Sequence, residues 1–197
     1  MTDISPEEIE MKVGAVLSGE YRFEKRFLID ASVHRKDQLI GTGTALNDVV
    51  LHPGQFIRMI EFELYIDGAF VYRQRSDGLI ISTPTGSTAY ALSVGGPIMH
   101  PQLDALVIVP LNPHTLSSRP IVVHGDSEIR VVVGDQRNIS PHVTFDGQNH
   151  EVTTEGDEIL VRKKKEQLCL VHPLDHDFYQ VCRNKLGWAS HARSYKL

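Results

Sequence analysis

The stretch Asp77-Gly78-Leu79-Ile80-Ile81-Ser82-Thr83-Pro84-Thr85-Gly86-Ser87-Thr88-Ala89-Tyr90 governs our interpretation of the rest of the chain. It begins with an Asp-Gly turn, and the apolar run 79–81 that follows is typical of a buried strand. Five hydroxyl residues then occur within seven positions, punctuated by a proline and a glycine. A short helix over 87–93, closed by Gly95-Gly96, fits next. We therefore predict a strand, a tight loop and a helix start in succession.

The hydroxyl-rich loop has two interpretations. A helix start leaves backbone N–H groups without partners, which suits anions and polar ligands, and Gly86 would let a ligand approach the backbone closely. Alternatively, Thr85 or Ser87 simply caps the helix, although the hydroxyls, the glycine and Tyr90 together exceed what one cap needs. The loop is not a P-loop, because no lysine follows the glycine, and it is not Gly-x-Gly-x-x-Gly.

Composition places the chain among ordinary globular proteins. Its 197 residues suit one domain, or one and a part, and 41% are hydrophobic while 23% are charged. The net charge of −5 gives no electrostatic case for nucleic acid. We expect no membrane span, because no apolar run approaches 18 residues, and no signal peptide. Cys169 and Cys182 form no Cys-x-x-Cys motif, so we expect free thiols in a reducing cytoplasm.

A helix is predicted at the N-terminal end and another near the C-terminal end. Ser5 can cap the first, Pro6 suits its first turn and Glu8 completes a capping box. Its apolar residues share one face, and we expect it to end near Ser18-Gly19. The segment 177–186 has apolar residues at roughly helical spacing and forms either a short helix or an irregular docking segment.

Between these helices the pattern is that of many short strands. Residues 21–27 alternate, and Asp67-Gly68 joins 62–66 to 69–72 in a predicted hairpin. Asp146-Gly147 predicts a second hairpin turn. Further strands are expected at Leu106–Val109, Ile121–Val123, Ile129–Val133, Val143–Phe145, His150–Thr153, Ile159–Arg162 and Leu168–Val171. The fold class is therefore mainly β, a β-sandwich-like domain with one short helix before it and another after the hydroxyl-rich loop.

The organising stretch, continued through Ala91-Leu92-Ser93-Val94-Gly95-Gly96-Pro97-Ile98, resembles the signature of bacterial NAD kinases. The resemblance extends to 45–50, to 112–120 and to 172–179, and so covers nearly the whole chain. It implies the C-terminal domain of the NAD kinase fold. In that case 1–20 is a linking helix from an N-terminal α/β domain, 21–175 is a β-rich NAD-binding domain and 176–197 is a tail.

The resemblance also implies a dinucleotide site. Taken alone, Asn47-Asp48 is a turn or cap pair, or a pair that donates to and accepts from a ribose diol or an adenine edge; in the family the matching pair contacts the adenosine. Asp77 is either a turn residue or, by resemblance, lies near the nicotinamide half. Arg58, set among apolar neighbours, and Arg75 could face phosphates. The remaining predicted binding residues are Thr85, Thr88, Ala89, Tyr90, Ala91, Leu92, Ser93, Asn112, His114 and, as a weaker candidate, Gln148.

Other chemistry finds less support. His172, Asp175, His176 and Asp177 are metal-binding in type, but their spacing matches no zinc signature, so no metal site is predicted. The basic run 162–165 reads better as a solvated strand end than as a phosphate patch. No Gly-x-Ser-x-Gly motif appears, so hydrolase chemistry is not expected.

A Gly-Gly-Asp-Gly motif is missing from this sequence. In NAD kinases its Asp activates the adenosine 2′-hydroxyl and helps to place Mg-ATP. The resemblance thus implies the reaction ATP + NAD → ADP + NADP for the full enzyme, with ATP and Mg²⁺ or another divalent cation. This chain would supply the NAD-binding domain, contribute no catalytic residue and be weakly active or inactive alone.

Two alternatives stay open at this stage. One is a non-catalytic dinucleotide-binding or interaction module; the other is a lipid or diacylglycerol-type kinase domain, against which the near-complete dinucleotide signature argues. As partners we expect a small-molecule dinucleotide and a second copy of the chain, as a homodimer or homotetramer. We expect neither nucleic acid nor membrane, and a cytoplasmic location.

Overall fold

The apolar run that opens the organising stretch forms the centre of strand β6 (Gly78–Ser82), all five residues of which are buried. Its neighbours β3 (Asp48–His52) and β7 (Ala105–Leu111) are also almost entirely buried. Strands covered on both faces read as continuous apolar runs because neither face meets water. These three adjacent strands therefore form the buried centre of one sheet.

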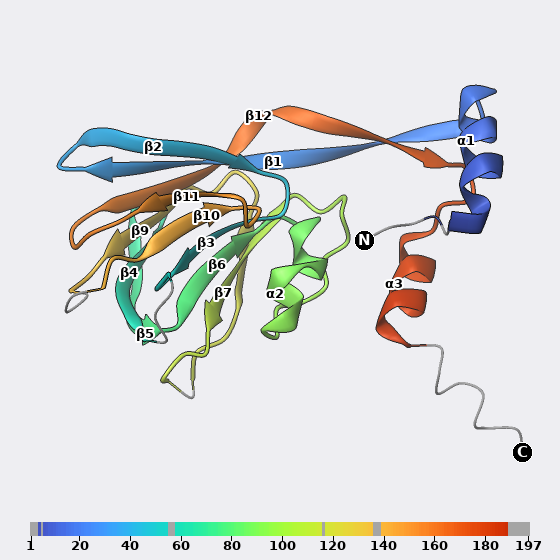
Figure 1. Cartoon of the computed structure of the whole chain (residues 1–197). Coiled ribbons are helices and arrows are strands. Elements are labelled where there is room, and N and C mark those ends of the chain that lie inside the picture. The colour runs from blue at the N-terminus through green and yellow to red at the C-terminus, as the bar shows by residue number, and fades with distance from the viewer. Residues whose placement is uncertain (1–3, 5, 55–57, 116, 136–138, 189–197) are drawn as a thin grey trace, which may run out of the picture. The chain divides into compact units, whose positions relative to one another are not determined.

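The computed structural model describes residues 4, 6–54, 58–115, 117–135 and 139–188. Among these, twelve strands form two six-stranded sheets, drawn in Figure 1. The first sheet has the order β2 (Gln38–Ala45), β1 (Tyr21–Arg35), β12 (Glu158–Pro173), β9 (Ile129–Val133), β4 (Ile60–Ile66) and β5 (Ala69–Ser76). The second has the order β11 (Asn149–Val152), β10 (His142–Phe145), β3, β6, β7 and β8 (Ile121–His124).

Two hydrophobic clusters show how the sheets are covered. The main core takes Ile29 from β1 and Phe62 from β4 in the first sheet, together with Leu79 and Ile81 from β6 in the second. It therefore lies between the two sheets, as in a sandwich. Ile80, which points to the opposite face of β6, belongs to a second cluster on the outer face of the second sheet.

The second cluster positions the segment that follows β6. Ala91, from the short helix α2 (Tyr90–Ser93), is completely buried in it, beside Val109 and Met99. Figure 1 shows α2 beside β6 and β7. The loop between β6 and α2 is therefore held against the outer face of the second sheet by apolar burial.

The contacts divide the chain into two units. Residues 26–168 contain the sandwich, while residues 1–25 and 169–197 together form the other unit, which contains α1 (Ile9–Leu17) and α3 (Phe178–Leu186). Within this second unit the ammonium of Lys12 pairs with the carboxylate of Asp175. None of the described helices is long and apolar enough to span a bilayer.

The predicted fold class is confirmed, and so are both hairpins. Asp67 and Asp146 each adopt a φ of +50° before a glycine with positive φ, as a tight hairpin turn requires. The predicted first helix ends with Ser18 at its C-cap, but Ser5 lies outside the described residues. The segment 177–186 is helical, and the backbone N–H of Tyr179 donates to the carboxylate of its N-cap, Asp177.

Two expectations need correction. The helix predicted over 87–93 is a 3₁₀ turn, η2 (Gly86–Thr88), followed by the single turn of α2, because Ala89 leaves the helical region with φ −101° and ψ −125°. The strands expected at 159–162 and 168–171 are parts of one long strand, β12. The polar residues between them do not end the strand, since a strand can continue where its side chains face water.

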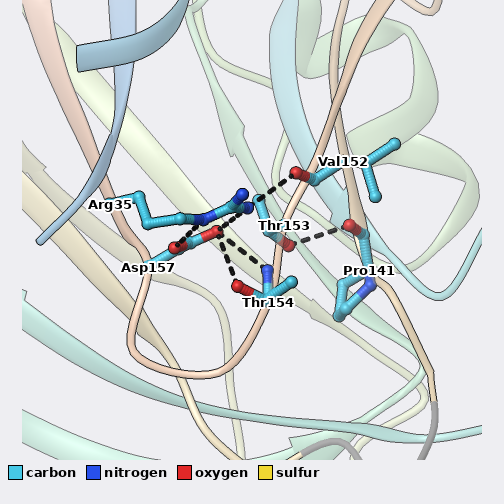
Figure 2. Close-up of polar contacts among 6 residues, drawn as sticks. All are labelled: Arg35, Pro141, Val152, Thr153, Thr154 and Asp157. Carbon is cyan, nitrogen blue, oxygen red and sulfur yellow. Dashed lines mark hydrogen bonds and ion pairs between the residues drawn. The ribbon is translucent and has the colours of Figure 1, made fainter. Parts of the chain in front are cut away.

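The two sheets are tied together at one end by a buried carboxylate (Figure 2). Arg35, the last residue of β1, donates to Asp157 through Nε at 2.9 Å and Nη2 at 2.7 Å, and its Nη2 also donates to the Val152 carbonyl of β11. The backbone N–H of Thr154 donates to the same carboxylate at 2.8 Å. Burial acts to raise the pKa of Asp157, but hydrogen bonds from Arg35 and Thr154 outweigh it, so the pKa lies below its usual range.

Replacing this carboxylate should destabilise the sandwich. We expect Asp157→Ala to lower the free energy of unfolding by about 2 kcal/mol at pH 7, as is typical for losing hydrogen bonds to a buried charged group. A carboxyl with a lowered folded pKa stabilises the fold above its unfolded pKa, and this contribution disappears as pH falls through the folded pKa. The loss, measured by urea unfolding, should therefore shrink below about pH 4. The exposed Asp126→Ala is the control, and an equal loss in both variants would contradict the assignment.

Candidate functional site

A cavity of about 710 Å³ opens in the sandwich unit where β3, β6 and β7 end beside the β10–β11 turn and the start of α2. Seven residues predicted for the site line it: Asn47, Asp48, Arg58, Asp77, Ala89, Tyr90 and Asn112. Nine lining residues were not predicted: Val50, His52, Pro53, Gly54, Val94, Leu111, Thr144, Asp146 and Gly147. The cavity combines an apolar floor with a ring of polar groups, which is typical of a small-molecule site.

The Asn47-Asp48 turn is fixed by one carboxylate from a distant hairpin. Asp146 accepts the backbone N–H groups of Leu46 at 2.8 Å, Asn47 at 2.7 Å and Asp48 at 3.0 Å. The backbone N–H of Asp146 donates to the Asp48 carbonyl at 3.0 Å in return. The sequence indicated Asp146 only as a turn former, because its partners lie about a hundred residues earlier and only strand pairing brings them together.

The hydroxyl-rich loop is packed against this same turn. Thr83 donates its hydroxyl to the Leu46 carbonyl at 2.6 Å, and Ser82 donates to the Asn47 carbonyl at 3.1 Å. A Cβ at Gly86 would overlap the backbone of Asn47. The glycine therefore admits the protein's own backbone rather than a ligand, contrary to our expectation from the sequence.

The remaining hydroxyls of the loop serve its own backbone. Ser87 donates to the Pro84 carbonyl at 2.7 Å and accepts from the Met99 N–H at 3.0 Å. Thr85 precedes η2 without a side-chain capping bond, so capping by Thr85 is not observed. These bonds make the loop a rigid support for the cavity wall that follows it at Ala89 and Tyr90.

Across the cavity, two polar side chains are held together. The side-chain amide of Asn112 donates to the carboxylate of Asp77 at 2.9 Å, and the backbone N–H of Asp77 donates to the Leu111 carbonyl at 2.9 Å. Asn112 adopts a φ of +42°, which asparagine tolerates better than most residues. Tyr90 leaves 47% of its surface exposed at the mouth, where its ring offers a stacking face.

The other predicted residues lie outside the cavity lining. Ala91 is completely buried in the second cluster, and Thr88 donates its hydroxyl to the Thr85 carbonyl. The backbone N–H of His114 donates to the Arg75 carbonyl at 3.4 Å. The predicted residues that do not line the cavity are Arg75, Thr85, Thr88, Ala91, Leu92, Ser93, His114 and Gln148.

Asp48 carries the most altered acidity in the cavity. It leaves 5% of its surface exposed, and burial, followed by the nearby charge of Asp146, raises its pKa to about 6. A buried carboxylate with a raised pKa in a cavity is a candidate functional group, because the fold pays a cost to keep it there.

A row of three imidazoles borders the cavity beyond Asp48. His52 lies 5.8 Å from His142, whose ring stacks on His150 at 5.0 Å. Burial, followed by the neighbouring imidazoles, lowers the pKa of both His52 and His142, so these rings are neutral at pH 7. The sequence gave no signal for this row, since its members come from three different strands.

The basic run 162–165 is not a phosphate patch. Arg162 pairs with Glu128, Lys163 pairs with Asp104 at 2.7 Å, and Lys164 pairs with Asp30 at 3.0 Å. These cations neutralise carboxylates on the sandwich itself.

Comparison with known proteins assigns the cavity to a family. The family described as ATP-NAD kinase C-terminal domain matches residues 46–173, which is more than half of the chain and contains every residue that lines the cavity. The chain belongs to the ATP-NAD kinase family. The resemblance stated from the organising stretch is thereby confirmed.

Relatives in this family are similar over nearly the whole chain. The chain is 66% identical to an NAD kinase of Saccharophagus degradans over 191 residues and 65% identical to one of Teredinibacter turnerae, covering 97% of this chain in each case. It spans 65% of the length of these relatives.

Two solved structures of the family share the fold. Yeast NADH kinase complexed with NADH matches with a TM-score of 0.86 and 29% identity, covering 96% of this chain and 58% of the yeast chain. An NAD kinase from Archaeoglobus fulgidus in complex with ATP matches with a TM-score of 0.75 and 30% identity, covering 95% of this chain and 68% of that one.

The Asp146 anchor can be tested by amide hydrogen exchange. We expect Asp146→Asn to accelerate exchange at Leu46, Asn47 and Asp48 by about ten- to a hundredfold, because an amide replaces a charged acceptor and such bonds contribute about 1.5–3 kcal/mol. Asn tolerates the positive φ of the turn, so the hairpin itself should persist. The control is Asp67→Asn, which changes the matching turn position between β4 and β5 and should leave these three amides unchanged. Unaltered protection in Asp146→Asn would refute the anchoring role.

The raised pKa of Asp48 predicts a stabilising substitution. A carboxyl whose folded pKa lies above its unfolded value weakens folding as pH rises through that range. We expect Asp48→Asn to raise the free energy of unfolding by about 2 kcal/mol at pH 8, since each unit of pKa shift is worth about 1.4 kcal/mol. Below about pH 4 the variant and the parent should unfold alike. Denaturant titrations at the two pH values make the measurement, and a variant that is less stable at pH 8 would contradict this.

Proposed function

We propose that this chain supplies the NAD-binding part of an NAD kinase, the enzyme that transfers a phosphoryl group from ATP to the adenosine 2′-hydroxyl of NAD to give NADP. The carrying observation is the cavity itself: it combines the anchored Asn47-Asp48 turn, the Asp77–Asn112 pair and the Tyr90 ring. The 66% identity to an NAD kinase supports this assignment, as does the likeness to a yeast kinase complexed with NADH.

Each side of the cavity suits one part of a dinucleotide. Asn47 both donates and accepts, and Asp48 when ionised accepts from two hydroxyls, as a ribose diol requires. Tyr90 offers a face on which a base can stack. The Asp77–Asn112 pair, on the opposite side, presents a carboxylate and an amide to a carboxamide such as that of nicotinamide. The 710 Å³ volume lies within the range usual for small-molecule sites.

Phosphoryl transfer needs more than these residues provide. It depends on cations that stabilise the transferred phosphoryl group, and on a group that orients the nucleophile. Among the described lining residues Arg58 is the one arginine or lysine. Asp48 and Asp146 do not fit a Mg²⁺ pair, because Asp146 already accepts three backbone N–H groups and burial disfavours ionisation of Asp48. ATP and Mg²⁺ would therefore be held chiefly by parts of the enzyme that this sequence does not contain.

The catalytic aspartate is one of those parts. The sequence has no Gly-Gly-Asp-Gly motif, and neither Asp48 nor Asp77 has a glycine-flanked setting open to phosphates. We expect the chain to bind the dinucleotide and to show little or no kinase activity by itself. The same observations favour the second candidate function, a non-catalytic dinucleotide-binding module.

We further propose a cytoplasmic location and a homodimeric or homotetrameric assembly. Cys169 and Cys182 are both free thiols, which suits a reducing compartment. Ile9, Met11 and Leu17 of α1 are all exposed, and apolar helix faces of this kind tend to be covered by association.

Isothermal titration calorimetry of the purified chain with NAD and with NADP tests the proposal. We expect saturable binding that Tyr90→Ala weakens by about 1–3 kcal/mol, the usual contribution of base stacking on an aromatic ring. Asp77→Ala should weaken binding as well. Tyr179→Ala and Asp126→Ala are the matched controls, because these side chains are similarly exposed and lie away from the cavity lining. No binding by a chain shown to be folded, or equal losses in the controls, would overturn the assignment.

A kinase assay on the same preparation separates the two candidate functions. Formation of NADP from NAD, ATP and Mg²⁺ that is lost in Asp77→Ala would assign catalysis to this chain. Binding without turnover would assign it the substrate site alone.

A further inference from the structure

A cluster of metal-binding side chains lies in the unit formed by the two ends of the chain, away from the cavity. Glu24 comes from the start of β1, His172 from the end of β12 and His176 from the turn that follows β12. Their ligand atoms all lie within 4.8 Å of one another. We propose that Glu24, His172 and His176 form a binding site for a divalent transition-metal ion, with Zn²⁺ as the best fit. This inference does not rest on the proposed function.

The spacing of the donor atoms suits a tetrahedral ion. The Nε2 atom of His172 lies 3.2 Å from Oε2 of Glu24. Metal–ligand bonds of about 2.0–2.1 Å place neighbouring ligands of a tetrahedral zinc site about 3.3 Å apart. His172 and His176 are also separated by three residues, within the His-x₃₋₅-His spacing found in zinc sites. Two imidazoles and one carboxylate leave a fourth position for water.

Two of the three donors are already withdrawn from water. His172 leaves 6% of its surface exposed and Glu24 leaves 9%. The ring of His176 stacks on that of His172, with the centroids 4.0 Å apart and the planes inclined by 16°. A bound cation would neutralise a carboxylate that is costly to keep in such a setting.

The turn that carries His176 is fixed by its own hydrogen bonds. Its backbone N–H donates to the Pro173 carbonyl at 3.1 Å, and Arg22 donates to its carbonyl oxygen at 2.6 Å. A site whose ligands sit on a fixed backbone loses less conformational freedom when the ion binds.

The acidic neighbours of these histidines are committed elsewhere. Asp175 pairs with Lys12, and Asp177 accepts the backbone N–H of Tyr179 at the start of α3. The carboxylate of the cluster therefore comes from Glu24, far earlier in the chain, which explains why the local sequence 172–177 shows no zinc signature.

The described residues contain one other group of three possible ligands, and it makes a useful control. Asp104, His124 and Asp126 are all exposed. The ammonium of Lys163 lies 2.7 Å from Asp104 and 3.2 Å from Asp126. A cation of the protein thus already neutralises those carboxylates, so we expect no tight metal binding there.

The experiment is calorimetric titration of the chelator-stripped 197-residue chain with Zn²⁺ at pH 7.5. One tight site per chain is expected. Glu24→Gln and His176→Ala should each weaken it by about tenfold or more, since each removes one of three protein ligands. His124→Ala should leave it unchanged. Circular dichroism establishes that each variant is folded, and visible absorption of a Co²⁺-loaded sample should show the intense bands of a four-coordinate ion.

A second readout is the thermal midpoint. Because an ion that binds only the folded state stabilises it, saturating Zn²⁺ should raise the midpoint of the parent and of His124→Ala, but not that of His176→Ala. The proposal is overturned if the stripped chain takes up no Zn²⁺ in a saturable way. It is equally overturned if the ligand variants bind as tightly as the parent, or if His124→Ala alone abolishes binding. The cluster would then be an ion pair with a stacked imidazole and no metal site.

Discussion

Burial of β6 on both faces is the constraint on which the architecture depends. Leu79 and Ile81 fill the core between the sheets, while Ile80 contributes to the cluster that holds α2 on the outer face. Because side chains alternate along a strand, a single apolar run supplies both clusters. The loop and helix that follow β6 are thereby fixed on the same sheet edge as the end of β3, and the cavity opens between them.

Within that frame, one carboxylate shapes the cavity wall. Asp146 orders the Asn47-Asp48 turn through three backbone N–H groups, and Gly86 lets the hydroxyl-rich loop approach the same turn. Three separate segments thus meet at one point without a side chain between their backbones. Such a wall is rigid before any ligand arrives, which lowers the ordering cost of binding.

The wall also carries an electrostatic cost. Two carboxylates, Asp48 and Asp146, lie close together, and burial raises the pKa of Asp48. A structural turn would be better served by a neutral residue at 48. The persistence of an acid there is intelligible if it meets hydroxyl groups of a ligand, since functional sites keep groups that the fold alone would not favour.

The sequence by itself determined the β class, both Asp-Gly hairpins, the two terminal helices and the family, because these depend on local turn chemistry, on period-two alternation and on one long contiguous motif. It also indicated seven of the residues that line the cavity. Only the tertiary structure decided the rest. Asp146 reaches the 46–48 turn through strand pairing, Gly86 faces protein rather than ligand, and Glu24 meets His172 across adjacent strands. Each of these contacts joins residues far apart in the chain, and no local pattern encodes which distant segment a side chain will meet.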